Sequence, residues 1–385
     1  MEAAQAAGFK RKDGLNDGDL RGFLGCNDMN YAGDERRSSY RAWLHGKQLP
    51  NLTIVTGAKA RRLVFDAQKA IAIEYEVAGV TRRANVAREV VLSAGALETP
   101  KLLMLSGVGP REHLESLGID VVEDARGVGR HLHDHPLVSL FYRCDAPVDF
   151  EYPQIYGFDA VKRGNDLPPD TCFVCYAAPA SLHQTMLRMI PILALPGRLY
   201  DIRPLRSLLR ALVNFAFTLP PLKRFVSKIF GIVVILGKPT SRGEIRLAST
   251  DPATPPRIDP AYYANAEDRD AILAGVEKAR AIAAQPALAR IGTKAMSAGG
   301  KALPIEKINQ WVAAATMTTF HFCGSCRMGN DADSPVDTQL RLKGLRNVRV
   351  ADASVIPEIP VSALNAPSMM IGYRAADFIL AGERA

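Results

Sequence analysis

The chain has 385 residues, more than the roughly 250–300 that one hydrophobic core serves, so we expect two structural units. Its net charge of +8 comes from scattered pairs of Lys and Arg, whereas a nucleic-acid-binding face needs a continuous basic stripe, so no nucleic-acid partner is expected. Six cysteines are too few for a disulfide scaffold and no uncharged apolar run reaches the ~18 residues of a membrane span, so a cytoplasmic location is expected.

The first part of the chain predicts a helix at residues 2–8, a turn-rich segment to residue 50, and then strands. The β-like runs cover residues 52–56, 62–65, 70–75 and 89–94. The last of them is continuously apolar, which is typical of a strand in a sheet covered on both faces. Gly95 ends it, and Thr99-Pro100 predicts a helix over 101–106 with Thr99 as its cap.

Residues 141–240 are less regular and contain most of the apolar segments interrupted by Pro. The later elements are more distinct. Strands are predicted at 232–236, 243–247 and 348–351, and helices at 267–284, 310–315 and 367–380. Alternating helices and strands of this kind predict an α/β or α+β fold.

Two segments near the C-terminus contain candidate catalytic residues. His321 begins the run His-Phe-Cys-Gly-Ser-Cys-Arg-Met-Gly, and a histidine has the side chain best suited to move a proton near neutral pH. Asn365-Ala366-Pro367 opens the last predicted helix, whose first-turn amides and dipole favour a negative charge. The other interpretation is structural, with a hydrogen-bonded His321 and Asn365 as a helix cap.

These two segments, together with residues 95–109, resemble the glucose-methanol-choline family of FAD-dependent alcohol oxidoreductases, which includes choline and alcohol dehydrogenases. The resemblance implies that His321 takes the hydroxyl proton while a hydride passes to the flavin. It also implies that Asn365 donates a hydrogen bond to the substrate oxygen, since an amide cannot act as a base. The motif departs from the family at Cys323, where Val is usual, and at Ser325, where Thr is commoner.

The same resemblance implies a set of cofactor contacts. They come from the end of the strand at 89–94, from the residues after the strand at 348–351, from the backbone of a strand residue where the family usually has Val, and from the start of the last helix. In this chain these are Ser93, Ala94, Gly95, Asp352, Ala353, Ala60, Asn365, Ala366 and Pro367.

The resemblance further implies an α/β (α+β) fold with a partial FAD-binding, Rossmann-like domain and a substrate domain. The first would comprise residues 1–140 and 335–385, and the second, with a mainly antiparallel sheet, residues 141–334. No stretch completes the G-x-G-x-x-G pattern of a dinucleotide fold. We therefore expect the first βαβ unit to be absent and the chain to be an N-terminally truncated member.

Metal and thiol chemistry are alternatives that the resemblance makes weaker. Two C-x-x-C pairs, at 172–175 and 323–326, could hold zinc or form a redox couple, but 147 residues lie between them. His131, His133 and His135 alternate as ligands on one strand face would. The family segment that they resemble is free of metal, usually with Asn and Gln in place of His131 and His133, so no metal site is expected.

The expected function is therefore FAD-dependent oxidation of a small-molecule alcohol to a carbonyl, with the particular alcohol and the electron acceptor left open. The alternative is a catalytically silent remnant or binding protein that does not hold FAD. A further feature is the segment 187–230, where Arg and Lys alternate with apolar residues and Pro. It predicts helices with a basic outer face or, as the sharper alternative, peripheral contact with an anionic membrane.

Overall fold

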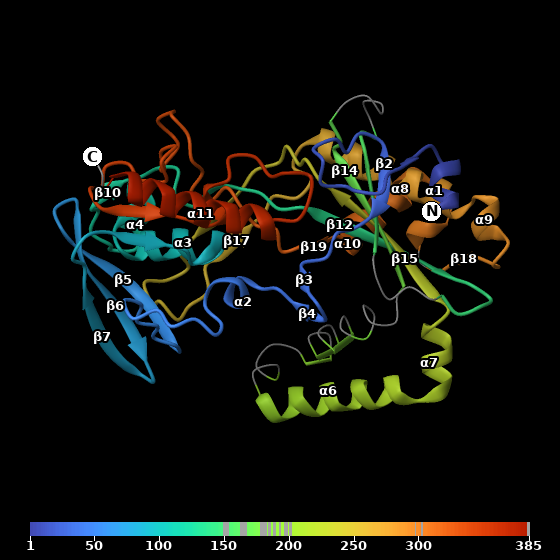
Figure 1. The fold of residues 1–385 in the computed structure, drawn as a ribbon, viewed down its shortest axis with the longest axis horizontal. Helices are drawn as coiled ribbons and strands as arrows, with labels where there is room; N and C mark the ends of the chain where they lie inside the picture. The colour runs from blue at the N-terminus through green and yellow to red at the C-terminus, as the bar shows by residue number, and fades with distance from the viewer. Residues whose placement is uncertain are drawn as a thin grey trace. The chain divides into compact units, whose positions relative to one another are not determined.

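The computed structural model describes residues 1–148, 154–161, 168–177, 202–296, 298–301 and 303–382, together with residues 183, 186, 187, 190, 191, 194, 195 and 199. Its described residues form two compact units (Figure 1). The first unit contains residues 1–29, 137–236 and 269–317, and the second contains residues 30–136, 237–268 and 318–385. The assignment of 1–140 and 335–385 to FAD and of 141–334 to the substrate concerns what these segments bind, and it stays a prediction.

The first unit is built on a mainly antiparallel sheet. Its strand order is β1 (Lys10–Arg11), β2 (Phe23–Cys26), β13 (Ile155–Asp159), β14 (Thr171–Ala177), β15 (Ile229–Leu236), β12 (Pro136–Arg143) and β18 (Lys294–Ala295), with β19 (Met317–Thr318) also paired to β12. Only β1 and β2 run parallel among the described pairs of this sheet. Strand β15 begins three residues before the predicted strand, and its apolar run is almost entirely buried.

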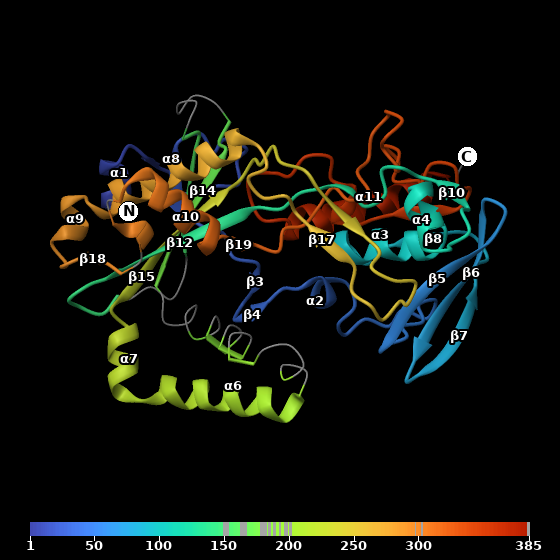
Figure 2. The same cartoon turned by 180° about the vertical axis from the view of Figure 1, so that it is seen from behind.

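Helix α8 (Ala266–Ala283) lies against this sheet (Figure 2). Ile272, Val276 and Ala279 recur at helical spacing and are buried. Contact with β15 is close, because a Cβ on Gly275 would lie 2.5 Å from a methyl carbon of Val234. The other helices given by the structure here are α1 (Glu2–Ala6), α6 (Arg203–Thr218), α7 (Pro220–Val226), α9 (Pro286–Ala289) and α10 (Ile305–Ala315).

The core of the second unit surrounds a parallel strand pair, β8 (Val90–Leu92) with β20 (Val348–Val350). Helix α3 (Gly95–Leu105) follows β8 directly. It therefore begins six residues before the predicted helix, and Thr99 lies within its first turns instead of capping it. Gly95 has a φ of +88°, a conformation that few residues other than glycine adopt, and this explains its place at the junction.

Smaller sheets complete the second unit. They are β5 (Ala58–Asp66), β6 (Lys69–Val77) and β7 (Val80–Asn85), all antiparallel; β11 (Arg130–Leu132), β16 (Gly243–Arg246) and β17 (Arg257–Asp259), also antiparallel; the parallel pair β9 (Val108–Gly109) and β10 (Glu123–Asp124); and the hairpin β3 (Tyr31–Ala32) and β4 (Glu35–Arg36). Short helices α2 (Ser39–Trp43) and α4 (Arg111–Ser116), the 3₁₀ turn η3 (Ala353–Val355) and helix α11 (Asn365–Gly382) accompany them.

One predicted strand is wrong. Residues 52–56 form no strand in the structure, and Leu52, Ile54 and Val55 are exposed. A β-branched run becomes a strand only where a partner and a packing surface exist, and this run has neither among the described residues.

No helix within the described ranges has the length and apolarity that crossing a bilayer demands.

Candidate active site

Asp352 joins the ends of the two central parallel strands of the second unit. Its side chain is buried, and one carboxylate oxygen, Oδ2, accepts hydrogen bonds from the Gly95 amide at 2.9 Å and the Thr99 hydroxyl at 2.6 Å. The other oxygen, Oδ1, accepts from the Ser354 amide at 2.8 Å. The carboxylate thus connects the N-terminus of α3 to η3. It holds the residues that follow β8 and β20 beside each other.

The two residues that precede Gly95 are fixed by the same junction. The Ser93 hydroxyl donates to the Ala351 carbonyl at 3.0 Å, and the Ala94 amide donates to the Thr99 hydroxyl oxygen at 3.1 Å. The structure therefore brings together four of the predicted cofactor residues with Asp352, namely Ser93, Ala94, Gly95 and, as the first residue of η3, Ala353.

A cavity of about 580 Å³ opens beside this junction, within the second unit. Ser93, Asp352 and Asn365 line it, so two sequence-predicted groups meet there. Its remaining walls come from Ala351, α2 and α11 and include the aromatic rings of Trp43 and Tyr373. The full lining is Ser39, Trp43, Ser93, Ala351, Asp352, Asn365, Ser368, Met369, Gly372, Tyr373 and Ala376. Its volume lies in the range of small-molecule and cofactor sites.

Asn365 is the first residue of α11, not its cap. The first hydrogen bond of the helical type runs from the Ser368 amide to the Leu364 carbonyl at 2.9 Å, so Leu364 is the capping residue. Asn365 and Ala366 are exposed at this end of an 18-residue helix. Amides in the first turn have no carbonyl partner inside the helix and carry the positive end of its dipole, so they are available to an anionic group.

The segment that begins with His321 runs along η3. The Gly324 amide donates to the Ala353 carbonyl at 3.3 Å, and the Cys326 amide donates to the Ser354 carbonyl at 2.9 Å. Position 324 needs a glycine for two reasons. Its φ is +84°, and a Cβ there would lie 2.3 Å from a ring atom of His133. This backbone pairing anchors the motif on the same turn that Asp352 holds.

Asp134 organises the turn that presents His321. It is 1% exposed and accepts hydrogen bonds from the hydroxyls of Tyr262 and Thr318 and, at 3.3 Å, of Thr319. Its Oδ1 also accepts from the His321 backbone amide at 2.7 Å. A buried carboxylate is stable when donors surround it, and here the donors are Tyr262 and three residues of the turn itself.

Phe320, immediately before His321, has an unusual backbone. Its φ is +61°, and its side chain is 71% exposed. A left-handed φ is costly for a bulky residue and persists only where the surrounding structure imposes it. The Phe320 amide donates to the Thr318 hydroxyl at 2.8 Å, so the same turn that Asp134 holds supplies the constraint.

The His321 ring contacts a second histidine, His135. Their Nδ1 atoms are 3.0 Å apart, and the two rings meet edge to face at 89°. The other nitrogen of His135, Nε2, lies 3.0 Å from the carbonyl oxygen of Gly237. A carbonyl only accepts, so His135 carries its proton on Nε2, and a neutral His135 accepts at Nδ1. His321 must then donate from Nδ1, which leaves a lone pair on its Nε2.

Burial supports the neutral form of both rings. It lowers the pKa of His135 to about 3, with a further decrease from the neighbouring His321. Burial also lowers the pKa of His321 from its ordinary value, while the negative charge of Asp134 opposes this decrease. Both histidines are therefore neutral at neutral pH, each with one protonated and one unprotonated ring nitrogen.

Two predicted residues do not line the larger cavity. Ala60 is an exposed residue of β5, paired with Tyr75 of β6, and is absent from the cavity lining. His321 is not among the residues that line the cavity containing Asn365. Asp134 and His135 were not predicted as site residues. The available signal was an Asp-His pair directly before Pro136, in a segment that the sequence analysis considered only as a possible metal site.

The described residues contain no group of three or more His, Cys, Asp or Glu side chains that could hold a metal ion. All six cysteines lie in the described ranges and are free thiols. Burial raises the pKa of Cys323 and of Cys326, and a buried neutral thiol is a poor nucleophile and ligand. The His133 ring binds the backbone instead of a metal, since its Nδ1 lies 2.6 Å from the His131 carbonyl.

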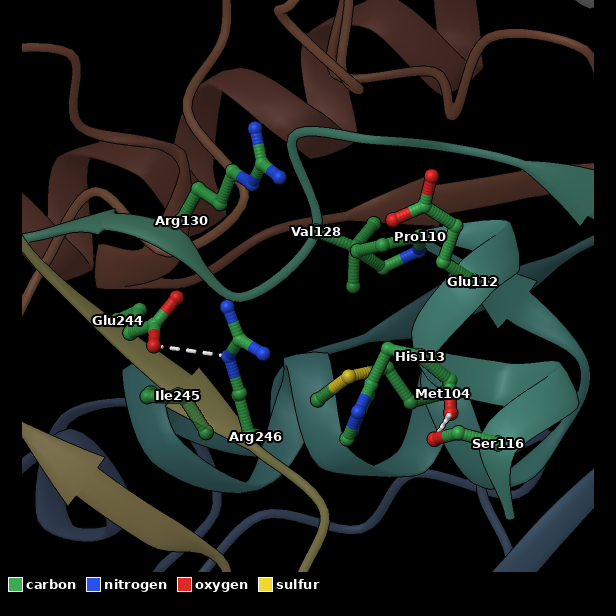
Figure 3. A pocket seen from close by; sticks show the side chains of 10 residues that line it. All are labelled: Met104, Pro110, Glu112, His113, Ser116, Val128, Arg130, Glu244, Ile245 and Arg246. Atoms are coloured by element: carbon green, nitrogen blue, oxygen red, sulfur yellow. Dashed lines mark hydrogen bonds and ion pairs between the residues drawn. The ribbon is translucent and has the colours of Figure 1, made fainter.

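A second cavity of about 300 Å³ lies where α3 and α4 meet β16 (Figure 3). Its charged side chains include the ion pair of Glu244 and Arg246 at 2.8 Å. His113 lines it too, but its Nε2 accepts a hydrogen bond from the Leu247 amide at 3.0 Å. None of the sequence-predicted site residues reaches this cavity.

Comparison with known proteins gives matches in both units of the chain. Two family models, both described as GMC oxidoreductase, match residues 1–137 and 239–372. Choline oxidase from Arthrobacter globiformis is 36% identical over 355 residues, which are 89% of this chain and 59% of that protein. Oxygen-dependent choline dehydrogenase from Chromohalobacter salexigens is 32% identical over 384 residues, which are 100% of this chain and 67% of that protein.

A solved structure is similar over almost the whole chain. Pyridoxine 4-oxidase from Mesorbium loti has a TM-score of 0.80 at 26% identity, and the match covers 98% of this chain and 68% of that one. The chain spans less than two thirds of the length of the choline oxidase, at 59%. Both GMC oxidoreductase family models nevertheless match the chain, and the choline dehydrogenase is matched over two thirds of its length. The chain therefore belongs to the GMC oxidoreductase family.

Proposed function

We propose that the protein oxidises a small-molecule alcohol to a carbonyl compound with FAD as its cofactor. Its relatives support the substrate class, because choline and pyridoxine, the compounds in their names, are both alcohols. The observation that carries the proposal is the hydrogen bond between His135 and His321. It leaves Nε2 of His321 as a free, neutral base.

The residues beside the larger cavity fit a flavin. The first-turn amides at Asn365 and Ala366 suit the negative charge of a reduced flavin, and the aromatic rings of Trp43 and Tyr373 suit a planar ring system. The Ser93 hydroxyl adds a polar group to the same wall. FAD, when bound, supplies the hydride acceptor. The cofactor contacts of Ala60, Ala94, Gly95, Asp352, Ala353 and Pro367 remain part of this proposal.

The chain's own groups divide the remaining work. His321 takes the hydroxyl proton of the alcohol at Nε2, since its Nδ1 already donates to His135. Asn365 donates a hydrogen bond from its side-chain amide to the substrate oxygen and cannot accept the proton. The positive end of α11 stabilises negative charge that develops near Asn365.

The proposal is tested with the purified protein. It is incubated with FAD, separated from free cofactor by gel filtration, and mixed anaerobically with choline, pyridoxine and a series of small alcohols. Retained flavin colour that at least one alcohol bleaches is the expected result. Protein that retains no flavin would favour the alternative, a binding protein without the cofactor, and retained flavin that none of these alcohols reduces would contradict alcohol oxidation.

We also propose peripheral contact with an anionic lipid surface, through α6 and α7 of the first unit. Leu208, Leu212 and Phe215 of α6 are exposed and recur at intervals of four and three residues, which places them on one face, and Leu219, which follows the helix, is exposed as well. The segment 203–228 contains six Lys and Arg residues and no Asp or Glu. A basic helix with an exposed apolar stripe matches an anionic interface in both charge and polarity.

Flotation with phosphatidylserine-containing and phosphatidylcholine vesicles tests this contact. Preferential flotation with the anionic vesicles, reduced by salt, is expected. Equal or absent flotation would contradict the proposal, as would a dimer in which the same stripe is buried. Arg188 and Arg198, which contributed to the basic character of this segment in the sequence, lie outside the described residues.

A further inference from the structure

His135 is placed to control which nitrogen of His321 is basic. Its ring is 1% exposed, and it lies between Asp134 and Pro136, where β12 begins. Its ring contacts His321 and the Gly237 carbonyl, and it also forms a hydrogen bond with the backbone of Pro360. The proposed reaction uses only Nε2 of His321, so His135 has no direct role in proton removal.

Backbone pairing fixes the distance between the two histidines. His133 and Cys323 form an antiparallel bridge, in which the His133 amide donates to the Cys323 carbonyl at 3.1 Å and the Cys323 amide returns a bond at 2.9 Å. His135 follows His133 by two residues, and His321 precedes Cys323 by two residues. The bridge therefore places His135 and His321 opposite each other. Asp134 adds its 2.7 Å bond to the His321 amide. The ring contact is therefore held from the backbone on both sides.

The proton positions follow from which atoms can donate. Gly237 offers a carbonyl oxygen, so the His135 proton sits on Nε2, and the lone pair on Nδ1 points at His321. If His321 instead carried its proton on Nε2, two lone pairs would face each other across 3.0 Å in a buried site. Such an unpaired, repulsive contact favours the other tautomer by roughly fivefold or more.

We infer that His135 is a positioning residue that holds His321 in the tautomer with its proton on Nδ1 and its lone pair on Nε2. The role of that lone pair in catalysis rests on the proposed function, whereas the tautomer itself does not. The Gly237 carbonyl holds the His135 proton on Nε2, so the chain of control runs from Gly237 through His135 to His321.

Nitrogen-15 NMR of the histidine rings tests the inference directly. The protein has seven histidines, and the signals of His321 are assigned by their loss in His321→Gln. At neutral pH the wild type should show a protonated Nδ1 and an unprotonated Nε2 for His321. His135→Leu removes the acceptor at similar volume and should shift the ring toward the other tautomer. His135→Asn, whose amide oxygen can stand where Nδ1 stood, should restore the wild-type pattern.

His133→Asn is the matched control. His133 is as buried as His135, but its Nδ1 contacts the His131 carbonyl and not His321, so the His321 signals should not change. A wild-type His321 protonated on Nε2 would overturn the inference, and this measurement needs no variant of His135 to fold. An unchanged tautomer in folded His135→Leu would overturn it as well.

Kinetics separate this inference from the proposed function. If the protein oxidises an alcohol, His135→Leu should lower kcat by about 10–100-fold with little change in KM, and His135→Asn should recover most of the rate. The expected tautomer in a protein that oxidises no alcohol would refute the proposed function and leave the positioning role intact. Alcohol oxidation with equal kcat in His135→Leu and wild type would refute the positioning role alone.

Discussion

His321 and Asn365 differ in what their side chains can do with a proton, and their substitution should separate the two roles. In protein loaded with FAD, His321→Ala removes the base and should lower the rate of flavin reduction by alcohol by about 10²–10⁴-fold while leaving flavin binding nearly intact. Asn365→Ala removes one orienting hydrogen bond and should cost less. Stopped-flow absorbance measures both, and a larger loss in Asn365→Ala would reverse the assignment.

The pH dependence of the rate should report the protonation of His321. Because burial lowers the pKa of His321, its neutral form persists below its ordinary value of about 6.5. The value of kcat/KM should thus be constant near neutral pH and fall only as the pH drops through this lowered pKa. A test alcohol without a titratable group keeps the profile free of substrate ionisation. An acidic limb centred above pH 6.5 would show that another group controls the rate.

Among the structural elements, the junction of β8, α3, β20 and η3 depends on one carboxylate. Asp352→Asn replaces one carboxylate oxygen with an NH₂ group. In one orientation this group faces the Gly95 and Thr99 donors, and in the other it faces the Ser354 amide. We expect a loss of about 2–3 kcal/mol in the free energy of unfolding, because a buried donor is left without an acceptor. Thr99→Val, which keeps the shape and removes only the hydroxyl, should cost about 1 kcal/mol.

Urea denaturation measures both losses, with wild-type protein in parallel. Equal stability of Asp352→Asn and wild type would mean that the carboxylate does not hold this junction. The order of the two variants is informative as well. A greater loss in Thr99→Val than in Asp352→Asn would place the important hydrogen bond between Thr99 and Ala94.

The apolar stripe of α6 gives a prediction for the proposed lipid contact. Phe215 is 64% exposed on that stripe, so Phe215→Ser should preserve the fold and reduce partitioning onto anionic vesicles by about tenfold or more. Val80→Ser is the matched control, since Val80 is similarly exposed on β7 and far from this segment in sequence. Vesicle sedimentation compares them. The same reduction in both variants would show that the stripe is not the contact.

Local patterns predicted many of these elements, and non-local contacts explain most of the errors. The apolar runs gave β8, β15 and β20, and Asn365-Ala366-Pro367 correctly marked the start of α11. The start of α3 was wrong, because its Gly95 amide is satisfied by Asp352, a partner 257 residues away. A partner at that distance leaves no local signal.

The candidate site shows the same division. Motif similarity singled out His321 and Asn365, whose roles remain predictions. It did not single out the contact of His135 with His321, which joins residues 186 positions apart. That contact depends on the bridge between His133 and Cys323, and strand pairing between distant segments cannot be deduced from either segment alone.

At the scale of the whole molecule, buried neutral histidines should make the protein sensitive to acid. Burial lowers the pKa of His133 to about 4, with further lowering by the positive charge of Arg242. An unfolded chain takes up a proton on this ring near pH 6.5, whereas the folded protein resists until about pH 4. Stability is therefore fully present above pH 6.5 and decreases as the pH falls toward the folded pKa.

His133→Gln should reduce this sensitivity, because Gln binds no proton in either state. Between pH 7 and pH 5 the free energy of unfolding of the wild type should fall by about 1–2 kcal/mol more than that of His133→Gln, at a slope of at most ~1.4 kcal/mol per pH unit for one histidine. His135 is present in both proteins, so its own contribution cancels. Denaturant midpoints at several pH values measure the difference. Parallel curves would show that His133 is equally easy to protonate in the folded and unfolded chains, and that its burial does not oppose the charge.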